Sequence, residues 1–201
     1  QAEVAAAAQG RGGNPEAHRL YLEGRHFVDQ FTREGVMRGV DRLEAATALA
    51  FKLAASFDGH DDPDATAYRR LMTPVTKYWV CKIAPPLVYE AMECLGGNAY
   101  VEEGGFPLLY REVPVNAIWE GSGNVMCLDV LRAVERSPET LERVLAGIEA
   151  ASGGEQRLKS AVDGVRILLG EAARDQARTR SVVELLALTA HCHEVDFLLF
   201  L

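Results

Sequence analysis

The sequence lacks any run of apolar residues close to the roughly 18 to 20 that a bilayer-spanning helix needs. It does not begin with a basic stretch followed by an apolar one, so no secretory signal is visible. It also lacks period-two alternation long enough to build a sheet. We therefore expect an all-α helical bundle, with no membrane partner and a cytoplasmic location. Because the first residue is Gln1 rather than Met, a missing upstream part is also to be expected.

Cysteine is scarce and never forms a CxxC pair. Four cysteines are scattered through helical-looking sequence: Cys81, Cys94, Cys127 and Cys192. This pattern suits buried free thiols in a reducing compartment better than disulfides or zinc. Residues 191–194 (His-Cys-His-Glu) offer metal-capable side chains, but adjacent residues on a helix point in different directions, so we expect no metal site.

An excess of positive charge is absent too. The chain carries 21 Lys and Arg against 29 Asp and Glu, a formal net charge of -8. Residues 129–201 hold nine basic and twelve acidic residues. Sequence-blind binding to nucleic acid requires several cations gathered against phosphates, and this balance does not favour it.

Most of the chain has apolar residues at the spacing of a helix face. Glycine-proline breaks and apolar spacing predict one helical domain with helices near 16–35, 43–57, 65–95, 125–135, 138–151, 156–178 and 181–197. Pro74, Pro85 and Pro86 should kink or interrupt the second long segment. Residues 98–118, with two Gly and two Pro, are expected to form a long ordered loop with only a short helix near 107–111.

Two segments can carry chemistry. The helix that ends at Gly96 and Gly97 offers backbone N–H groups that a ligand can approach closely, although such a pair can equally be a simple helix C-cap. Glu120 follows apolar Ile118 and Trp119, surroundings that disfavour the charged carboxylate and suit it to accept a weakly acidic proton. The alternative is that Glu120 only caps the helix that begins near Ser122, which could itself be capped by Ser122 or Asn124.

Residues 90–132 resemble the C-terminal domain of the acyl-CoA dehydrogenase family, and the resemblance extends back to Leu43. It is carried by two motifs, ECLGGN at 93–98 and IWEGSGN at 118–124, which are most similar to the AidB branch associated with the response to DNA alkylation. The resemblance implies an all-helical bundle and FAD as the cofactor. It implies that Glu120 is the catalytic base, removing the proton alpha to an acyl-CoA thioester while hydride leaves the beta carbon for the flavin.

The same resemblance implies which residues bind the cofactor: Glu93, Gly96, Gly97, Trp119, Gly121, Ser122, Gly123 and Asn124. Ser122 stands where the family has a hydrogen-bonding Thr, and Trp119 could equally be core. Arg111 aligns with an arginine of the family's short helix and is expected to form a structural pair. The implied partners are an acyl-CoA-like small molecule, further copies of this chain in an oligomer and an electron-transfer protein.

The resemblance does not cover the whole chain. It divides the sequence into a poorly matching segment at 1–41, a helical domain of the family's C-terminal type at 42–136 and a helical extension at 137–201. Intact members place a helical and a beta domain before these helices, so we expect weak flavin binding, no dehydrogenase activity from this chain alone, and an exposed apolar patch that favours self-association. Two alternatives stay open: a DNA-binding alkylation-response protein and a non-catalytic helical interaction module.

Overall fold

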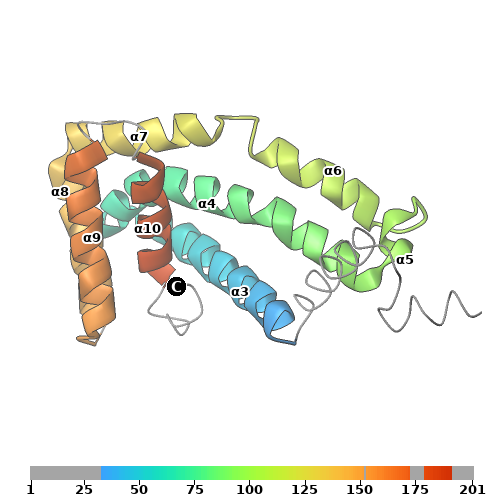
Figure 1. Ribbon diagram of the computed structural model, residues 1–201. Coiled ribbons are helices and arrows are strands. Elements are labelled where there is room, and N and C mark those ends of the chain that lie inside the picture. Colours follow the sequence, from blue (N-terminus) through green and yellow to red (C-terminus); the bar gives the residue numbers. More distant parts are fainter. Residues whose placement is uncertain (1–32, 152, 173–178, 192–201) are drawn as a thin grey trace, which may run out of the picture. The chain divides into compact units, whose positions relative to one another are not determined.

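The computed structural model describes residues 33–151, 153–172 and 179–191, and every element in these ranges is a helix (Figure 1). The prediction of an all-α fold is confirmed. The helices are α3 (Arg33–Ser56), α4 (Pro63–Leu95), α5 (Gly97–Tyr100), α6 (Phe106–Asn116), α7 (Gly123–Arg136), α8 (Pro138–Ala151), α9 (Gln156–Ala172) and α10 (Thr179–His191). The chain divides into two compact units at residues 40 and 41, and the fold described below is that of the second.

Helix α4 is the central element of this unit and contacts α5, α6, α7, α8 and α10. It begins after Asp62, whose side chain accepts a 2.9 Å hydrogen bond from the backbone N–H of Asp64 and so satisfies one free donor of the first turn. The predicted interruption at Pro74, Pro85 or Pro86 is wrong, because α4 runs through all three, and a kink at these residues stays a prediction. Each proline removes one backbone hydrogen bond, and the contacts of α4 with five other helices offset that loss.

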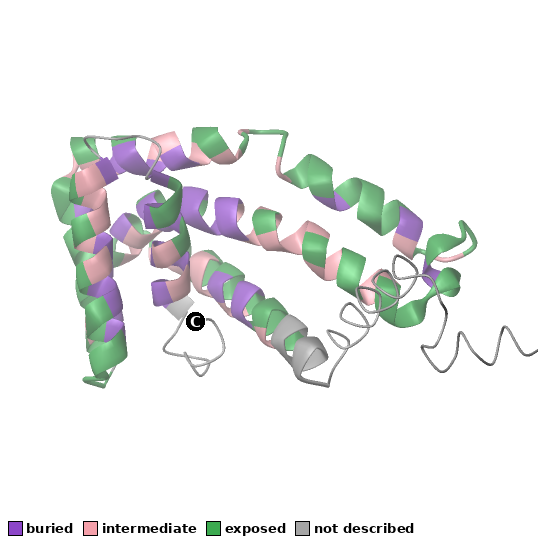
Figure 2. Ribbon diagram, viewed as in Figure 1, coloured by how far each residue is buried: buried purple, intermediate pink, exposed green. Residues whose placement is uncertain are grey.

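The core is built from apolar stripes that α3, α4, α7, α8, α9 and α10 turn toward one another (Figure 2). In α8 the buried residues follow the 3, 4 and 7 spacing of one helix face: Leu141, Val144, Leu145 and Ile148. Burying a side chain of this size contributes roughly 1.5–3 kcal/mol, so these stripes supply the main force that holds the bundle together.

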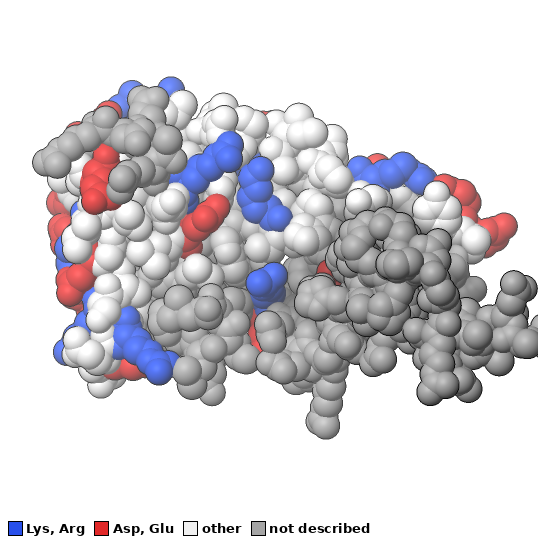
Figure 3. All heavy atoms as spheres, viewed as in Figure 1, with Lys and Arg blue, Asp and Glu red and all other residues white. Residues whose placement is uncertain are grey.

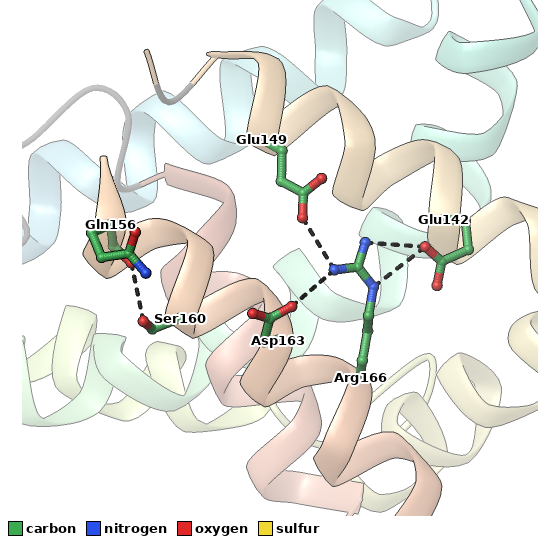
Figure 4. A network of polar contacts seen from close by, with 6 residues as sticks. All are labelled: Glu142, Glu149, Gln156, Ser160, Asp163 and Arg166. Atoms are coloured by element: carbon green, nitrogen blue, oxygen red, sulfur yellow. Dashed lines mark hydrogen bonds and ion pairs between the residues drawn. The ribbon is translucent and has the colours of Figure 1, made fainter. Parts of the chain in front are cut away.

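An ion-pair network joins α8 to α9 at the surface (Figure 4). The Arg166 guanidinium lies 3.1 Å from a carboxylate oxygen of Glu142, 3.1 Å from Glu149 and 3.3 Å from Asp163. Exposed pairs contribute about 1 kcal/mol or less each, so the network adds little to the stability that the apolar core supplies.

The expected loop at 98–118 is also wrong. Residues 97–100 form α5, and residues 106–116 form α6, which packs against α4. Pro107 lies in the first turn of α6, where a missing N–H is not needed, and the buried Val113 holds the helix to the bundle. No helix in the described ranges is long and apolar enough to span a membrane.

The other predictions for helices and cysteines have mixed outcomes. The predicted helix at 16–35, and the parts of two others beyond Ala172 and His191, lie largely or wholly outside the described residues. Cys81, Cys94 and Cys127 are free thiols, as expected, but only Cys127 is buried and Cys94 is exposed; Cys192 lies outside the described residues. Burial raises the pKa of the Cys81 and Cys127 thiols, which keeps both protonated at neutral pH.

Candidate functional site

The candidate catalytic carboxylate lies on the turn that connects α6 to α7. Both helices pack against α4, so this turn is held beside the middle of α4 (Figure 1). The backbone N–H groups of Ile118 and Trp119 both donate to the carbonyl of Val115, and the Trp119 indole N–H donates to the Asn116 side chain at 3.2 Å. The end of α6 therefore continues into an ordered turn.

Glu120 has a backbone conformation that side chains rarely adopt. Its φ is +53°, the one positive value among described residues other than glycine, and Gly121 follows with φ +113°. The left-handed region brings the side chain close to its own backbone and costs roughly 1–2 kcal/mol for a residue with a Cβ. Such strained conformations persist only where surrounding contacts hold them, and they cluster at functional sites.

The contact that holds this turn comes from α4. The ammonium group of Lys77 donates to the backbone carbonyl of Trp119 at 2.6 Å and to that of Gly121 at 3.0 Å. These carbonyls belong to the two residues that flank Glu120. Lys77 thus fixes the backbone on both sides of the candidate base.

The carboxylate itself is exposed, and so are the apolar residues before it. Ile118 is 67% exposed and Trp119 56% exposed. The expectation that these apolar neighbours desolvate the carboxylate is therefore wrong for this chain, as is the alternative that Trp119 belongs to the core. Glu120 is exposed, while Lys77 binds the carbonyls of the two residues that flank it.

The glycines after Glu120 let the turn pass close to α4 and α7. A Cβ placed on Gly121 would lie 2.4 Å from the terminal methyl carbon of Met126, and one placed on Gly123 would lie 3.2 Å from the Tyr78 ring. A pocket of about 10 Å³, about the space for one water molecule, lies between Lys77, Tyr78, Cys81, Lys82 and the turn. Of the two candidate caps, Ser122 is the N-cap residue of α7, although its hydroxyl makes no capping hydrogen bond.

Helix α10 holds the start of α7 from the other side. Arg180 donates to the Asn124 side-chain oxygen from two nitrogens, at 3.1 Å and 2.6 Å. The Tyr78 hydroxyl donates to Glu184 at 2.8 Å. Lys77, Tyr78, Arg180 and Glu184 were not predicted from the sequence, because each lies 40 to 110 residues from its partner and belongs to no motif.

The second motif lies at the end of α4. Gly96 has φ +62° and donates its N–H to the Glu93 carbonyl at 3.1 Å, which confirms the C-cap interpretation. A Cβ on Gly96 or Gly97 would meet nothing within 4 Å, so the backbone is open to a flat ligand, as a dinucleotide cofactor requires. Glu93 is exposed, and its hydrogen bond with Tyr89 raises the pKa of that phenol.

The structure does not bring the two motifs together. Gly96 lies nineteen positions after Lys77 along α4, a rise of about 28 Å at 1.5 Å per residue. Arg111, between them, forms a two-bond ion pair with Glu102 at 2.9 Å and 3.1 Å, which confirms its structural pairing. The two motifs therefore lie on separate surfaces of the chain.

Charge offers little to a nucleic-acid partner. On the face drawn in Figure 3, Lys and Arg side chains lie among acidic ones and large uncharged areas. Several of the basic groups are already engaged within the protein, as Arg166, Arg180 and Lys77 illustrate. The alternative of a DNA-binding protein gains no support from the described surface.

The chain is similar to one known protein family. The family model "acyl-CoA dehydrogenase, C-terminal domain" matches residues 17–135, more than half of the chain. "Putative acyl-CoA dehydrogenase AidB" of Escherichia coli (strain K12) is 39% identical over 163 residues, which cover 81% of this chain and 30% of that protein. "Acyl-CoA dehydrogenase family member 11" of Caenorhabditis elegans is 38% identical over 104 residues, which cover 50% of this chain and 17% of that protein.

A solved structure is also similar. The crystal structure of Caenorhabditis elegans ACDH-11 in complex with C11-CoA superimposes with a TM-score of 0.61 and 26% sequence identity. The match covers 75% of this chain and 30% of that one. This chain therefore spans less than a third of the length of these relatives.

Proposed function

Because the chain belongs to the acyl-CoA dehydrogenase family through its C-terminal domain, we propose that it carries the catalytic base of an FAD-dependent dehydrogenation of acyl-CoA thioesters. In this proposal the Glu120 carboxylate removes the proton alpha to the thioester carbonyl. FAD, when bound, accepts the hydride from the beta carbon. The acyl-CoA ligand of the similar ACDH-11 structure supports the substrate class.

The observation that carries the proposal is the backbone of Glu120. A carboxylate needed only for solubility would not require a left-handed residue whose two flanking carbonyls are held by a half-buried lysine. A base must be held within hydrogen-bond reach of the proton that it removes, and an ordered turn meets this requirement better than a mobile loop. The exposure of Glu120 leaves it accessible to a substrate.

We assign the cofactor contacts to two surfaces. Glu93, Gly96 and Gly97 form one, where open backbone permits close approach. Trp119 and the residues 121–124 form the other, beside the base. Because these surfaces lie about 28 Å apart along α4, a complete site needs protein in addition to one copy of this chain. The remaining length of the relatives and an oligomer of this chain are both sources of that protein.

The test is an absorbance spectrum of the purified protein after reconstitution with FAD and desalting, recorded with and without acyl-CoA. If an oligomer of this chain supplies the missing protein, the flavin is retained and acyl-CoA bleaches it; if the remaining length of the relatives is required, this chain alone retains little flavin. In Glu120→Gln the flavin should be retained but not bleached, since an amide cannot accept the proton. Glu155→Gln, which changes an exposed carboxylate at the start of α9, is the control and should behave as the wild type.

The opposite results have clear meanings. Bleaching that persists in Glu120→Gln would remove Glu120 from the reaction. A folded protein that never retains flavin would contradict catalysis by this chain alone and leave the non-catalytic interaction module as the better description.

A further inference from the structure

Lys77 has a specific spatial relation to the proposed base. We propose that Lys77 is a positioning residue that holds Glu120 in its reactive orientation, an inference that rests on the proposed role of Glu120 as the base. The Lys77 ammonium does not touch the reacting atoms. It acts through the backbone carbonyls of Trp119 and Gly121, at 2.6 Å and 3.0 Å.

The direction of these two carbonyls determines where the side chain between them points. The carbonyls of Trp119 and Gly121 can both accept hydrogen bonds from one ammonium group only if the chain turns sharply at Glu120, the residue between them. Glu120 supplies this turn with φ +53°, and Gly121 extends it with φ +113°. Removing the cation would leave the two carbonyl oxygens close together without the donor that brought them there, and Glu120 would be free to leave the left-handed region.

The anchor is rigid because its helix is packed into the core. The residues on either side of Lys77, Thr76 and Tyr78, are both buried. Tyr78 packs against Gly123, so two consecutive residues of α4 contact the turn on both sides of Ser122 and hold it in place. A position set by the core in this way is better defined than one set by loop contacts alone.

Lysine suits this task because its ammonium is compact and carries three donors. Two of them bind the turn. Lys82 provides a matched comparison, since it lies on the same helix and lines the same pocket, but its ammonium sits over the Tyr78 ring, 5.9 Å from the centroid. The aliphatic stem of Lys82 packs beside Gly123, a contact that methionine can keep, so the two lysines share surroundings and differ in the hydrogen bonds that Lys77 donates to the turn.

The experiment measures the turn and the chemistry separately in the purified protein. Hydrogen exchange of the peptide that spans residues 117–124, followed by mass spectrometry, reports the turn. Lys77→Met keeps the aliphatic stem and removes the donors, and we expect exchange there to rise about tenfold or more, as for a turn that opens locally. Lys82→Met should leave the exchange unchanged.

The chemistry is measured as the rate of flavin reduction by acyl-CoA. Lys77→Met should lower the limiting rate by about 10- to 100-fold, because a small displacement of a catalytic group has effects of that size, while KM changes by less than about 3-fold. If Lys77→Met fails to fold, Lys77→Gln retains two N–H donors on a shorter, uncharged side chain and should give intermediate values in both measurements.

The two proposals fail in different ways. Glu120→Gln should abolish flavin reduction and leave exchange of residues 117–124 unchanged, because its carboxylate takes no part in the Lys77 contacts. Unchanged exchange in Lys77→Met, or raised exchange with an unchanged rate, would overturn the positioning role alone. Flavin reduction retained in Glu120→Gln would overturn the function proposed for Glu120 and with it the catalytic part of the role of Lys77.

Discussion

The hydroxyl of Tyr78 donates a 2.8 Å hydrogen bond to the carboxylate of Glu184, joining the centre of α4 to α10. Tyr78 is only 4% exposed, whereas Glu184 reaches solvent. Burial, and then the bond to Glu184, raises the pKa of Tyr78 far above its ordinary value of 10.0. The folded protein thus retains the phenol proton under conditions in which the unfolded chain would lose it.

Tyr78→Phe should therefore lower stability by an amount that depends on pH. At neutral pH we expect a cost of about 0.5–1.5 kcal/mol for one lost hydrogen bond, with Glu184 left solvated. A group whose pKa is raised on folding stabilises the fold fully below its unfolded pKa and progressively less above it. The free energy of unfolding of the wild type should hence exceed that of Tyr78→Phe up to about pH 10, and this difference should shrink at higher pH.

Urea denaturation of both proteins at pH 7, 9, 10 and 11 measures this difference. Tyr100→Phe removes an exposed hydroxyl and serves as the control, with an expected change within about 0.5 kcal/mol. A difference between wild type and Tyr78→Phe that stays constant from pH 9 to 11 would contradict the assignment.

Gly121→Ala should destabilise the turn that carries Glu120. The φ of +113° is strained for any residue with a Cβ, and the new methyl would have to displace the end of Met126. We expect a loss of about 1–3 kcal/mol in free energy of unfolding, measured from the urea midpoint. Gly97→Ala is the matched control, because its Cβ meets nothing within 4 Å and its φ is not positive, so a change within about 0.5 kcal/mol is expected there. Equal losses in the two variants would show that the Gly121 backbone is not specially constrained.

The sequence predicts the helices well where local signals and packing agree. The helix at 138–151 has the predicted bounds, since Ser137 and Pro138 mark its start and a regular apolar stripe marks its buried face. Pro85 and the residues of α6 show where this fails. Proline and glycine lower the local stability of a helix. Whether the helix nevertheless forms depends on its contacts with other helices, which cannot be read from the sequence.

Only the segment around Glu120 could be predicted from the sequence, and the residues of other helices that contact it could not. The glycines after Glu120 indicate an unusual turn, and the structure has one. That Lys77 would hold it could not be predicted, because a lysine on a long helix resembles any solvated surface residue. The exposure of Trp119 depends in the same way on which neighbouring surfaces are present, and residue type alone does not determine it.

Self-association should involve the apolar surface of α5, α6 and the following turn. We define this surface by its exposed residues: Tyr100, Val101, Leu108, Leu109, Ile118 and Trp119. So many large apolar side chains along one stretch are unusual on a monomer and are typical of an interface. Burying them against a second copy would stabilise a dimer through the hydrophobic effect.

Placing a charge in this surface should weaken that association. Leu108→Glu would bury an unpaired carboxylate at the interface, and we expect the dissociation constant measured by analytical ultracentrifugation to rise at least tenfold, because the desolvation of an unpaired charge costs several kcal/mol. Ile167→Glu makes the same kind of change at an exposed residue of α9 and should leave the constant unaltered. A wild type that remains monomeric at high concentration, or equal weakening by both substitutions, would exclude the α5 and α6 surface as the interface.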